Sequence, residues 1–243
     1  MNTHNLNKQT TSELKTQTNP VGSRLISKVL SPALKLFLRS QVEQVSHLEV
    51  KIIGGDRQIF TGNIPQVSIS AQHVIYQGLH LGQIGLVGNG IRTNLSQVLK
   101  GQPLRLIEPV LVSGELMQHQ ADLNASLQSP LLSNALTELL QMLLPANYQL
   151  QAHWHKITVE PNQLILIGEY DDSSKKMPLL LHCGLQLLSC HELQLTQIEL
   201  QSPNISFEKL ENYTIDLGSH VDLQELTLHL GKLVCRGSIT VMP

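Results

Sequence analysis

Aromatic residues are scarce in this sequence, in which three Phe, four Tyr and one Trp make up 3% of the 243 residues. Charged residues are also few, at 15% against a typical value of about 25%. The formal net charge of −2 excludes the strongly basic surface with which many proteins bind nucleic acid. Because 41% of the residues are nevertheless apolar, the composition is that of a folded globular protein with an aliphatic interior.

Cysteine and long hydrophobic runs are lacking as well. Cys183, Cys190 and Cys235 are an odd number without a C-x-x-C pair, which indicates reduced thiols, since a bridge between the first two would require a turn between them. No apolar stretch approaches the roughly 18 residues of a membrane span. Met1–Pro20 lacks the apolar core of a secretory signal, so we expect it to be a disordered polar tail on a cytoplasmic protein.

Motifs for catalysis or cofactor binding are absent, because none of G-x-S-x-G, G-x-x-x-x-G-K-[ST], G-x-G-x-x-G or H-E-x-x-H occurs. His153 and His155 would share one face of a strand and could bind a metal ion, but solvated imidazoles explain them more simply. His182–Cys183 and Cys190–His191 could form a nucleophile pair only with suitable geometry. We therefore predict no enzymatic activity, no cofactor and no metal site.

Two segments carry apolar residues at helical spacing. The first begins at Ser23 and contains Pro32, which should kink the helix or start a new one. In the second, Ser129 can cap the helix, Pro130 fits the first turn, and Pro145 ends the leucine-rich run. Both helices have apolar faces so broad that we expect other elements to enclose them.

The remaining segments predict β-strands. Gln58–Gln128 is read as strands interrupted by glycine, and the many glycines of Gly78–Gly90 predict strong curvature. Pro103 and Pro109 favour an edge or a bulge in the strand region near them. The chain returns to strands from Tyr148 onward. Because successive strands have no helices between them, antiparallel pairing and an α+β fold are favoured.

The first helix also has a basic side. Arg24, Lys28, Lys35 and Arg39 fall within a sector of about 60° on a helical wheel. A basic amphipathic helix is attracted to an anionic membrane surface, and these four residues are our candidates for contact with lipid headgroups. At about 1 kcal/mol each they supply at most about 4 kcal/mol, which is only millimolar binding. The alternative is a core helix whose basic side is simply solvated.

The surplus of aliphatic residues leaves two alternatives, a solid core or an apolar groove that accepts lipid. An acyl chain gains about 0.8 kcal/mol for each buried methylene, so a groove needs shape and apolar walls but no reactive residue. The helix residues that we expect to line such a groove are Ile26, Leu30, Leu34, Phe37, Leu132, Leu136, Leu140 and Leu143.

Three blocks of the sequence resemble a known family. The block QADLNASLQSPLL (Gln120–Leu132), the closing block Ile215–Val241, and VKIIGGD (Val50–Asp56) after the first helix are similar to the LmeA-like phospholipid-binding family, with coverage of Val21–Pro243. The resemblance implies a single domain like the tubular lipid-binding proteins, in which long helices are cradled by a highly curved antiparallel sheet. The glutamine-rich, lysine-poor composition resembles that of cyanobacterial members.

The resemblance implies binding of phospholipid in the cell envelope, but exported members begin with a signal or anchor sequence. Since Met1–Pro20 is hydrophilic, we expect peripheral association with the cytosolic face of a membrane instead. Our leading hypothesis is non-enzymatic binding, or transfer, of a phospholipid or another acyl-chain lipid. The alternatives are a structural or adaptor module that uses an apolar helix face to form a homodimer or bind a protein partner, and an enzyme of unrecognised type.

Overall fold

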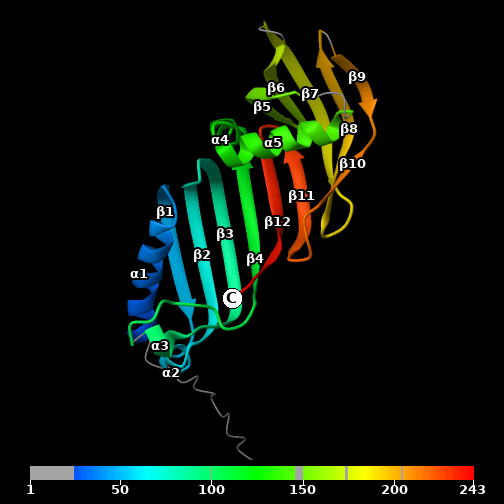
Figure 1. Ribbon diagram of the computed structural model, residues 1–243. Coiled ribbons are helices and arrows are strands. Elements are labelled where there is room, and N and C mark those ends of the chain that lie inside the picture. The colour runs from blue at the N-terminus through cyan, green and yellow to red at the C-terminus, as the bar shows by residue number, and fades with distance from the viewer. Residues whose placement is uncertain (1–24, 99, 146–149, 173–174, 204) are drawn as a thin grey trace, which may run out of the picture.

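The computed structural model describes residues 25–98, 100–145, 150–172, 175–203 and 205–243, with backbone alone for 25–29 and 205–210 (Figure 1). The tail predicted for residues 1–20 lies outside this range. The elements in chain order are α1 (Leu25–Ser40), β1 (Gln44–Ile53), α2 (Asp56–Phe60), β2 (Asn63–Tyr76), β3 (Leu79–Arg92), α3 (Leu95–Val98), β4 (Val110–His119), α4 (Gln120–Ser126), α5 (Pro130–Leu143), β5 (Ala152–Glu160), β6 (Gln163–Asp172), β7 (Lys175–Leu187), β8 (Glu192–Ser202), β9 (Ile205–Leu210), β10 (Tyr213–Asp216), β11 (Val221–His229) and β12 (Lys232–Val241).

The strands form two antiparallel sheets, which confirms the α+β class (Figure 1). The first sheet has the order β1-β2-β3-β4-β12-β11, and the second has the order β10-β8-β7-β6-β5 with β9 paired to β8. The chain leaves the first sheet after β4, builds the second sheet, and returns as β11 and β12. The first sheet is therefore completed by the last residues of the chain.

The two predicted helices are present. In α5, the side-chain oxygen of Ser129 accepts a hydrogen bond from the Leu131 N–H at 3.2 Å, so the predicted cap is confirmed. Pro32 lies inside α1 and does not begin a new helix.

The interpretation of Gln58–Gln128 as strands was wrong at three short helices, α2, α3 and α4. Pro103 and Pro109 mark neither an edge nor a bulge, because both lie in the connection before β4, and β4 itself is central, between β3 and β12. Short helices of this kind escape a search for periodicity since tertiary contacts, rather than an apolar stripe of their own, hold them in place.

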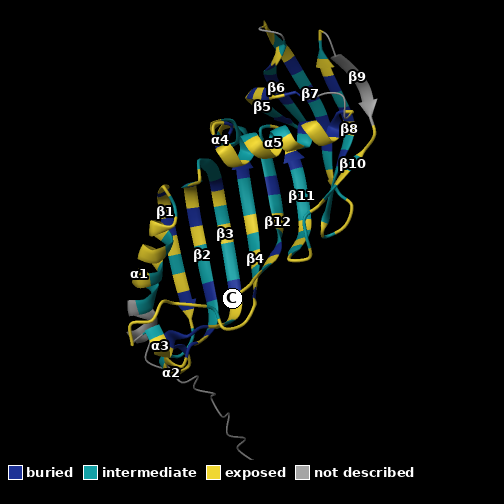
Figure 2. Ribbon diagram, viewed as in Figure 1, coloured by how far each residue is buried: buried dark blue, intermediate teal, exposed yellow. Residues whose placement is uncertain are grey.

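One face of the first sheet is apolar on all six strands. The strand register places Leu48, Ala71, Ile84, Leu116 and Cys235 side by side in one row from β1 to β12. On β1 and β2, serine, glutamine, histidine and charged residues occupy the alternate positions, so more exposed and more buried positions alternate along these two strands (Figure 2). On β3, β4 and β12 the opposite face also carries apolar residues, among them Val87, Leu111 and Val234. A continuous apolar face of this size requires cover.

Helices cover this face only at its ends. Over β1 and β2, Leu30, Leu34 and Leu38 of α1 pack against the apolar face. At the far end of β11 and β12, Leu228 and Leu233 join the large core of the second sheet, which also contains α5. Between these two covers, on β3, β4, β12 and β11, the middle of the face is open, and α4 contacts the sheet at the start of β3, where Ser126 bonds to His80.

Helix α4 joins the two sheets through polar side chains. Asn124 donates to the carbonyl of Ile157 and accepts from its N–H, both at 2.8 Å, and the Gln120 side chain accepts from the Val159 N–H at 2.9 Å. These partners belong to β5, an edge strand of the second sheet. On the opposite side, the Ser126 hydroxyl accepts from the N–H of His80 in β3 at 2.8 Å.

Candidate functional site

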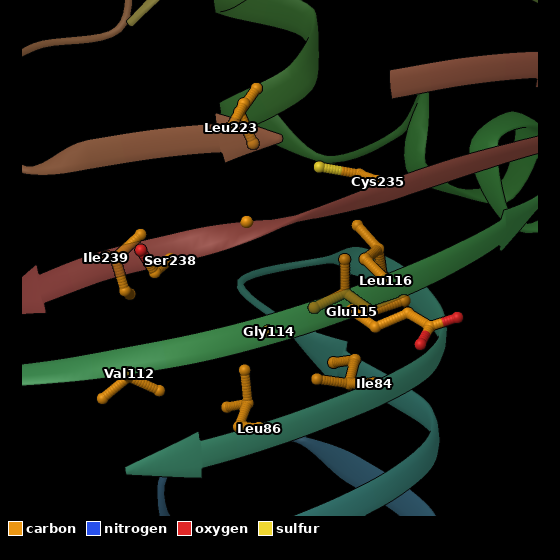
Figure 3. A pocket seen from close by; sticks show the side chains of 12 residues that line it. Ile84, Leu86, Val112, Gly114, Glu115, Leu116, Leu223, Cys235, Ser238 and Ile239 are labelled. Carbon is orange, nitrogen blue, oxygen red and sulfur yellow. The ribbon is translucent and has the colours of Figure 1, made fainter. Parts of the chain in front are cut away.

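The uncovered stretch of the first sheet contains a hollow of about 210 Å³. Its walls come from β3, β4, β11 and β12, and Figure 3 shows their side chains around it. The lining residues are Leu81, Ile84, Leu86, Val112, Gly114, Glu115, Leu116, Leu223, Cys235, Gly237, Ser238 and Ile239. We call this site the sheet hollow.

Two paired glycines account for the shape of the sheet hollow. Gly114 of β4 pairs directly with Gly237 of β12, so the middle of the apolar face has two neighbouring positions without side chains. A Cβ at Gly114 would lie 3.0 Å from Leu86 Cδ2, and one at Gly237 would lie 2.3 Å from the Asp222 carbonyl oxygen. Larger residues here would therefore fill the site or displace β11.

The sheet hollow is open and almost entirely apolar. Ile239, at its rim, is 47% exposed although its side chain is fully aliphatic. Glu115 is the single charged lining residue. Because it is next to Gly114 in β4, its side chain faces the opposite side of the sheet, where it forms an ion pair with Arg236 at an Nη2–Oε1 distance of 3.1 Å. Arg236 donates hydrogen bonds to Glu115 and to Glu225 on the opposite face of the sheet, and these bonds raise its pKa. The apolar walls of the hollow can accommodate a hydrocarbon chain.

The eight predicted groove residues lie elsewhere in the structure. Leu140 and Leu143 are buried in the core of the second sheet, and Leu132 and Leu136 are partly buried against that core. Phe37 is 53% exposed on α1. Leu30 and Leu34 pack on the β1 end of the first sheet, and the side chain of Ile26 lies outside the described residues. None of the eight is among the twelve residues that line the sheet hollow.

The predicted headgroup residues are described only in part, because Arg24 and the side chain of Lys28 lie outside the described residues. Lys35 and Arg39 are exposed on α1. The pKa of Glu49 is lowered, first by a hydrogen bond from Lys51 and to a smaller extent by charges that include Lys35. Glu49 itself forms an ion pair with Lys51, with an Nζ–Oε1 distance of 3.0 Å.

The candidates for metal binding and nucleophilic catalysis lie apart from the sheet hollow. His153 and His155 are both exposed, and the His155 Nε2 atom lies 3.6 Å from a carboxylate oxygen of Glu169. In the part of the chain that the structure describes, no three His, Cys, Asp or Glu side chains form a group that could hold a metal ion.

All three cysteines are free thiols. Burial raises the pKa of Cys183 to about 11, whereas His182 is only partly buried. The Cys190 Sγ atom lies 3.3 Å from the His191 Nε2 atom in the turn between β7 and β8. Cys235 alone of the three lines the sheet hollow.

A second, larger hollow of about 630 Å³ lies against β6, β7 and β8. Gln201 and Ser202 contribute polar atoms to it beside Ile167 and Leu180, and it is a shallow surface feature. The sheet hollow is the better candidate for a lipid site because its lining is almost wholly apolar.

The sheet hollow was missed in the sequence, although a signal for it exists. Val112, Gly114 and Leu116 alternate along β4, and Cys235, Gly237 and Ile239 alternate along β12. Each strand thus has a glycine in the middle of an apolar face, but only the register shows that the two glycines are paired.

No described helix is long and apolar enough to cross a membrane. Searches of curated proteins and of solved structures found no match. The profile of the LmeA-like phospholipid-binding family matches residues 21–238, which include the second sheet, all of the first sheet except the last three residues of β12, and every residue of the sheet hollow except Ile239. The chain therefore belongs to the LmeA-like phospholipid-binding family.

Proposed function

We propose that residues 21–243 form a single, non-enzymatic domain that binds a phospholipid with an acyl chain in the sheet hollow. The observation that carries this proposal is the uncovered apolar strip around Gly114 and Gly237, within a chain of a phospholipid-binding family. The unity of the domain is supported by Leu228 and Leu233, which belong to the first sheet and pack in the core of the second.

Energetics indicate how such a lipid would be held. Burial of about eight methylenes contributes about 6 kcal/mol, which corresponds to a dissociation constant of roughly 40 µM. A second contact is therefore needed for stable binding. We propose that α1 and α5, which cover the two ends of the apolar face, lie on either side of the lipid as in the tubular lipid-binding fold, and that Arg24, Lys28, Lys35 and Arg39 contact phosphate groups at an anionic membrane surface.

Cys235 provides a direct test of occupancy. Alkylation of a thiol requires the thiolate, and burial together with the charge of Glu225 raises the pKa of Cys235, so labelling is carried out at a pH of about 8.5. Loading with phosphatidylglycerol should slow alkylation of Cys235 about ten-fold, because the acyl chain covers the Sγ atom. Peptide mass spectrometry after timed exposure to iodoacetamide measures this rate.

Two other thiols are internal controls in the same sample. Cys190 lies in the β7–β8 turn, and its rate should not change on loading. Cys183 is 2% exposed and should remain unlabelled in the folded protein in both states. Equal rates for Cys235 with and without lipid would contradict the proposed location of the acyl chain. Protection of Cys235 only at high protein concentration would indicate that a second copy covers the strip.

The contribution of the basic helix side is tested separately. Replacing Lys35 and Arg39 with Gln should weaken flotation with anionic vesicles roughly ten-fold, since each of these two exposed cations contributes at most about 1 kcal/mol. The matched control neutralises Lys156 and Lys175, two exposed lysines on the second sheet. Equal binding of both double variants would make the basic side of α1 a solvated surface.

A further inference from the structure

One end of the first sheet combines exposed apolar side chains with positive charge. The end consists of the last residue of β1, Ile53, together with α2, α3 and residues 100–109 before β4, which lie together below the strands (Figure 1). The exposed apolar residues there are Ile53, Phe60, Leu104 and Ile107, each between 46% and 55% exposed. We call this end the sheet tip.

The sheet tip is a built structure, held together by hydrogen bonds from buried residues. The Asn94 side chain donates to the Pro103 carbonyl at 2.9 Å and accepts from the Arg105 N–H at 2.8 Å. The Ile107 N–H donates to the Arg92 carbonyl at 2.8 Å. Asn94 is itself only 8% exposed, so it fixes the connection and thereby presents Leu104 and Ile107 to solvent.

The charge of the sheet tip is opposite to that of the whole chain. Residues 53–62 and 92–109 carry four basic and two acidic side chains, a net charge of +2, whereas the whole chain has −2. Arg92 pairs with Glu108 at 3.4 Å. Arg57, Lys100 and Arg105 are exposed. Apolar side chains surrounded by cations complement an anionic bilayer, whose headgroups attract the cations and whose acyl region accepts the apolar groups.

We propose that the sheet tip is the membrane-docking site of this protein, with Phe60, Leu104 and Ile107 inserted below the phosphates of an anionic lipid surface. This proposal rests on the proposed membrane association and names the surface that performs it. The connection that carries Ile107 leads directly into β4, where Val112 lines the sheet hollow. Docking at the tip thus turns the end of the hollow that carries Val112 and Ile239 towards the lipid headgroups.

The test is flotation of the full chain with vesicles of phosphatidylcholine and phosphatidylglycerol. Replacing Arg57 and Arg105 with Gln should weaken binding about 30-fold, and replacing Phe60 and Ile107 with Ser should weaken it at least ten-fold. Vesicles of phosphatidylcholine alone should bind the wild-type chain much more weakly. Thermal unfolding checks that both variants, all of whose changes are at exposed positions, remain folded.

Matched controls make the outcomes decisive. The Leu188→Ser/Leu230→Ser variant removes two apolar side chains that are 51% and 74% exposed in hairpin turns elsewhere, and it should bind like the wild type. The proposal is overturned if the tip variants float like the wild type, if the control loses binding equally, or if the tip variants lose only self-association in sedimentation velocity. Protection of Cys235 by lipid reports on the sheet hollow independently, so failure of the tip and failure of the hollow are distinguishable.

Discussion

Ile239→Asp should reduce phospholipid binding more than 100-fold while leaving the fold intact. Ile239 is 47% exposed at the rim of the sheet hollow, so a carboxylate there is solvated in the empty protein. A bound acyl chain would cover that carboxylate in an apolar environment, at a cost of at least about 3 kcal/mol. Native mass spectrometry of the purified protein, with titration of a fluorescent acyl-chain probe, measures the loss.

Leu111→Asp is the matched control for this change. Leu111 is 58% exposed on β4, and the register pairs its neighbour Val112 with Ile239, so Leu111 faces the opposite side of the same sheet. The control should retain both co-purified lipid and probe affinity. If both variants bind the probe equally well, the sheet hollow is not the lipid site.

A second variant tests whether lipid binding requires the empty volume of the sheet hollow as well as its apolar lining. Gly114→Leu fills the floor of the sheet hollow and should also reduce probe binding, since a Cβ there already lies 3.0 Å from the flexible end of Leu86. Its control is Gly85→Leu, because an added Cβ at Gly85 has no neighbour within 4 Å and Gly85 lies on the opposite face. Reduced binding of Gly114→Leu alone would show that the empty volume itself is used.

The parts of the fold that were predictable are those with local signals. Ser129, Pro130 and the leucine spacing that follows specify α5 without any tertiary contact, and polar–apolar alternation specifies the strands. Helix α4 has no such signal, since Gln120 and Asn124 are held by hydrogen bonds to a strand that follows more than thirty residues later. Only the folded register reveals its role.

The candidate site, too, could be predicted from the sequence only in part. A surplus of aliphatic surface was visible in the composition, but its location was assigned to the leucine faces of the helices. Leu140 is instead fully buried in the second core, because β5 to β8 enclose it. The uncovered apolar surface lies on the first sheet, where Gly114 and Gly237 meet across strands that are distant in the sequence. Pairing of distant strands is information that single-sequence periodicity does not contain.

The hydrogen bonds of α4 indicate the structural role of the block QADLNASLQSPLL, which resembles the family. Its polar side chains bond to backbone groups of β3 and β5 and none of them lines the sheet hollow, so the block fastens one sheet to the other. The closing block contributes Leu223, Cys235 and Ile239 to the hollow itself. Of the blocks that resemble the family, the closing one therefore contributes directly to the proposed lipid site.

Asn124→Ala should lower the free energy of unfolding by about 3 kcal/mol. Asn124 satisfies both backbone groups of Ile157, a residue of the edge strand β5 that is only 5% exposed, and each orphaned group costs about 1–3 kcal/mol. Asn124→Asp should be nearly as destabilising, because it keeps the acceptor for the Ile157 N–H but turns a second oxygen toward the Ile157 carbonyl. Without the Asn124 side chain the edge of β5 is also more exposed, so the variants should aggregate more readily on heating.

Urea denaturation followed by the fluorescence of Trp154 measures this effect, since Trp154 is the single tryptophan of the chain and lies 6% exposed on the same strand as Ile157. Asn134→Ala, an exposed change on α5, is the matched control and should stay within about 0.5 kcal/mol of the wild type. A change below about 1 kcal/mol for Asn124→Ala would mean that water replaces the side chain at the β5 edge. In that case the two sheets would be held together mainly by the packing of Leu228 and Leu233 and by backbone hydrogen bonds such as that from the Gly231 N–H to the Val159 carbonyl at 2.8 Å.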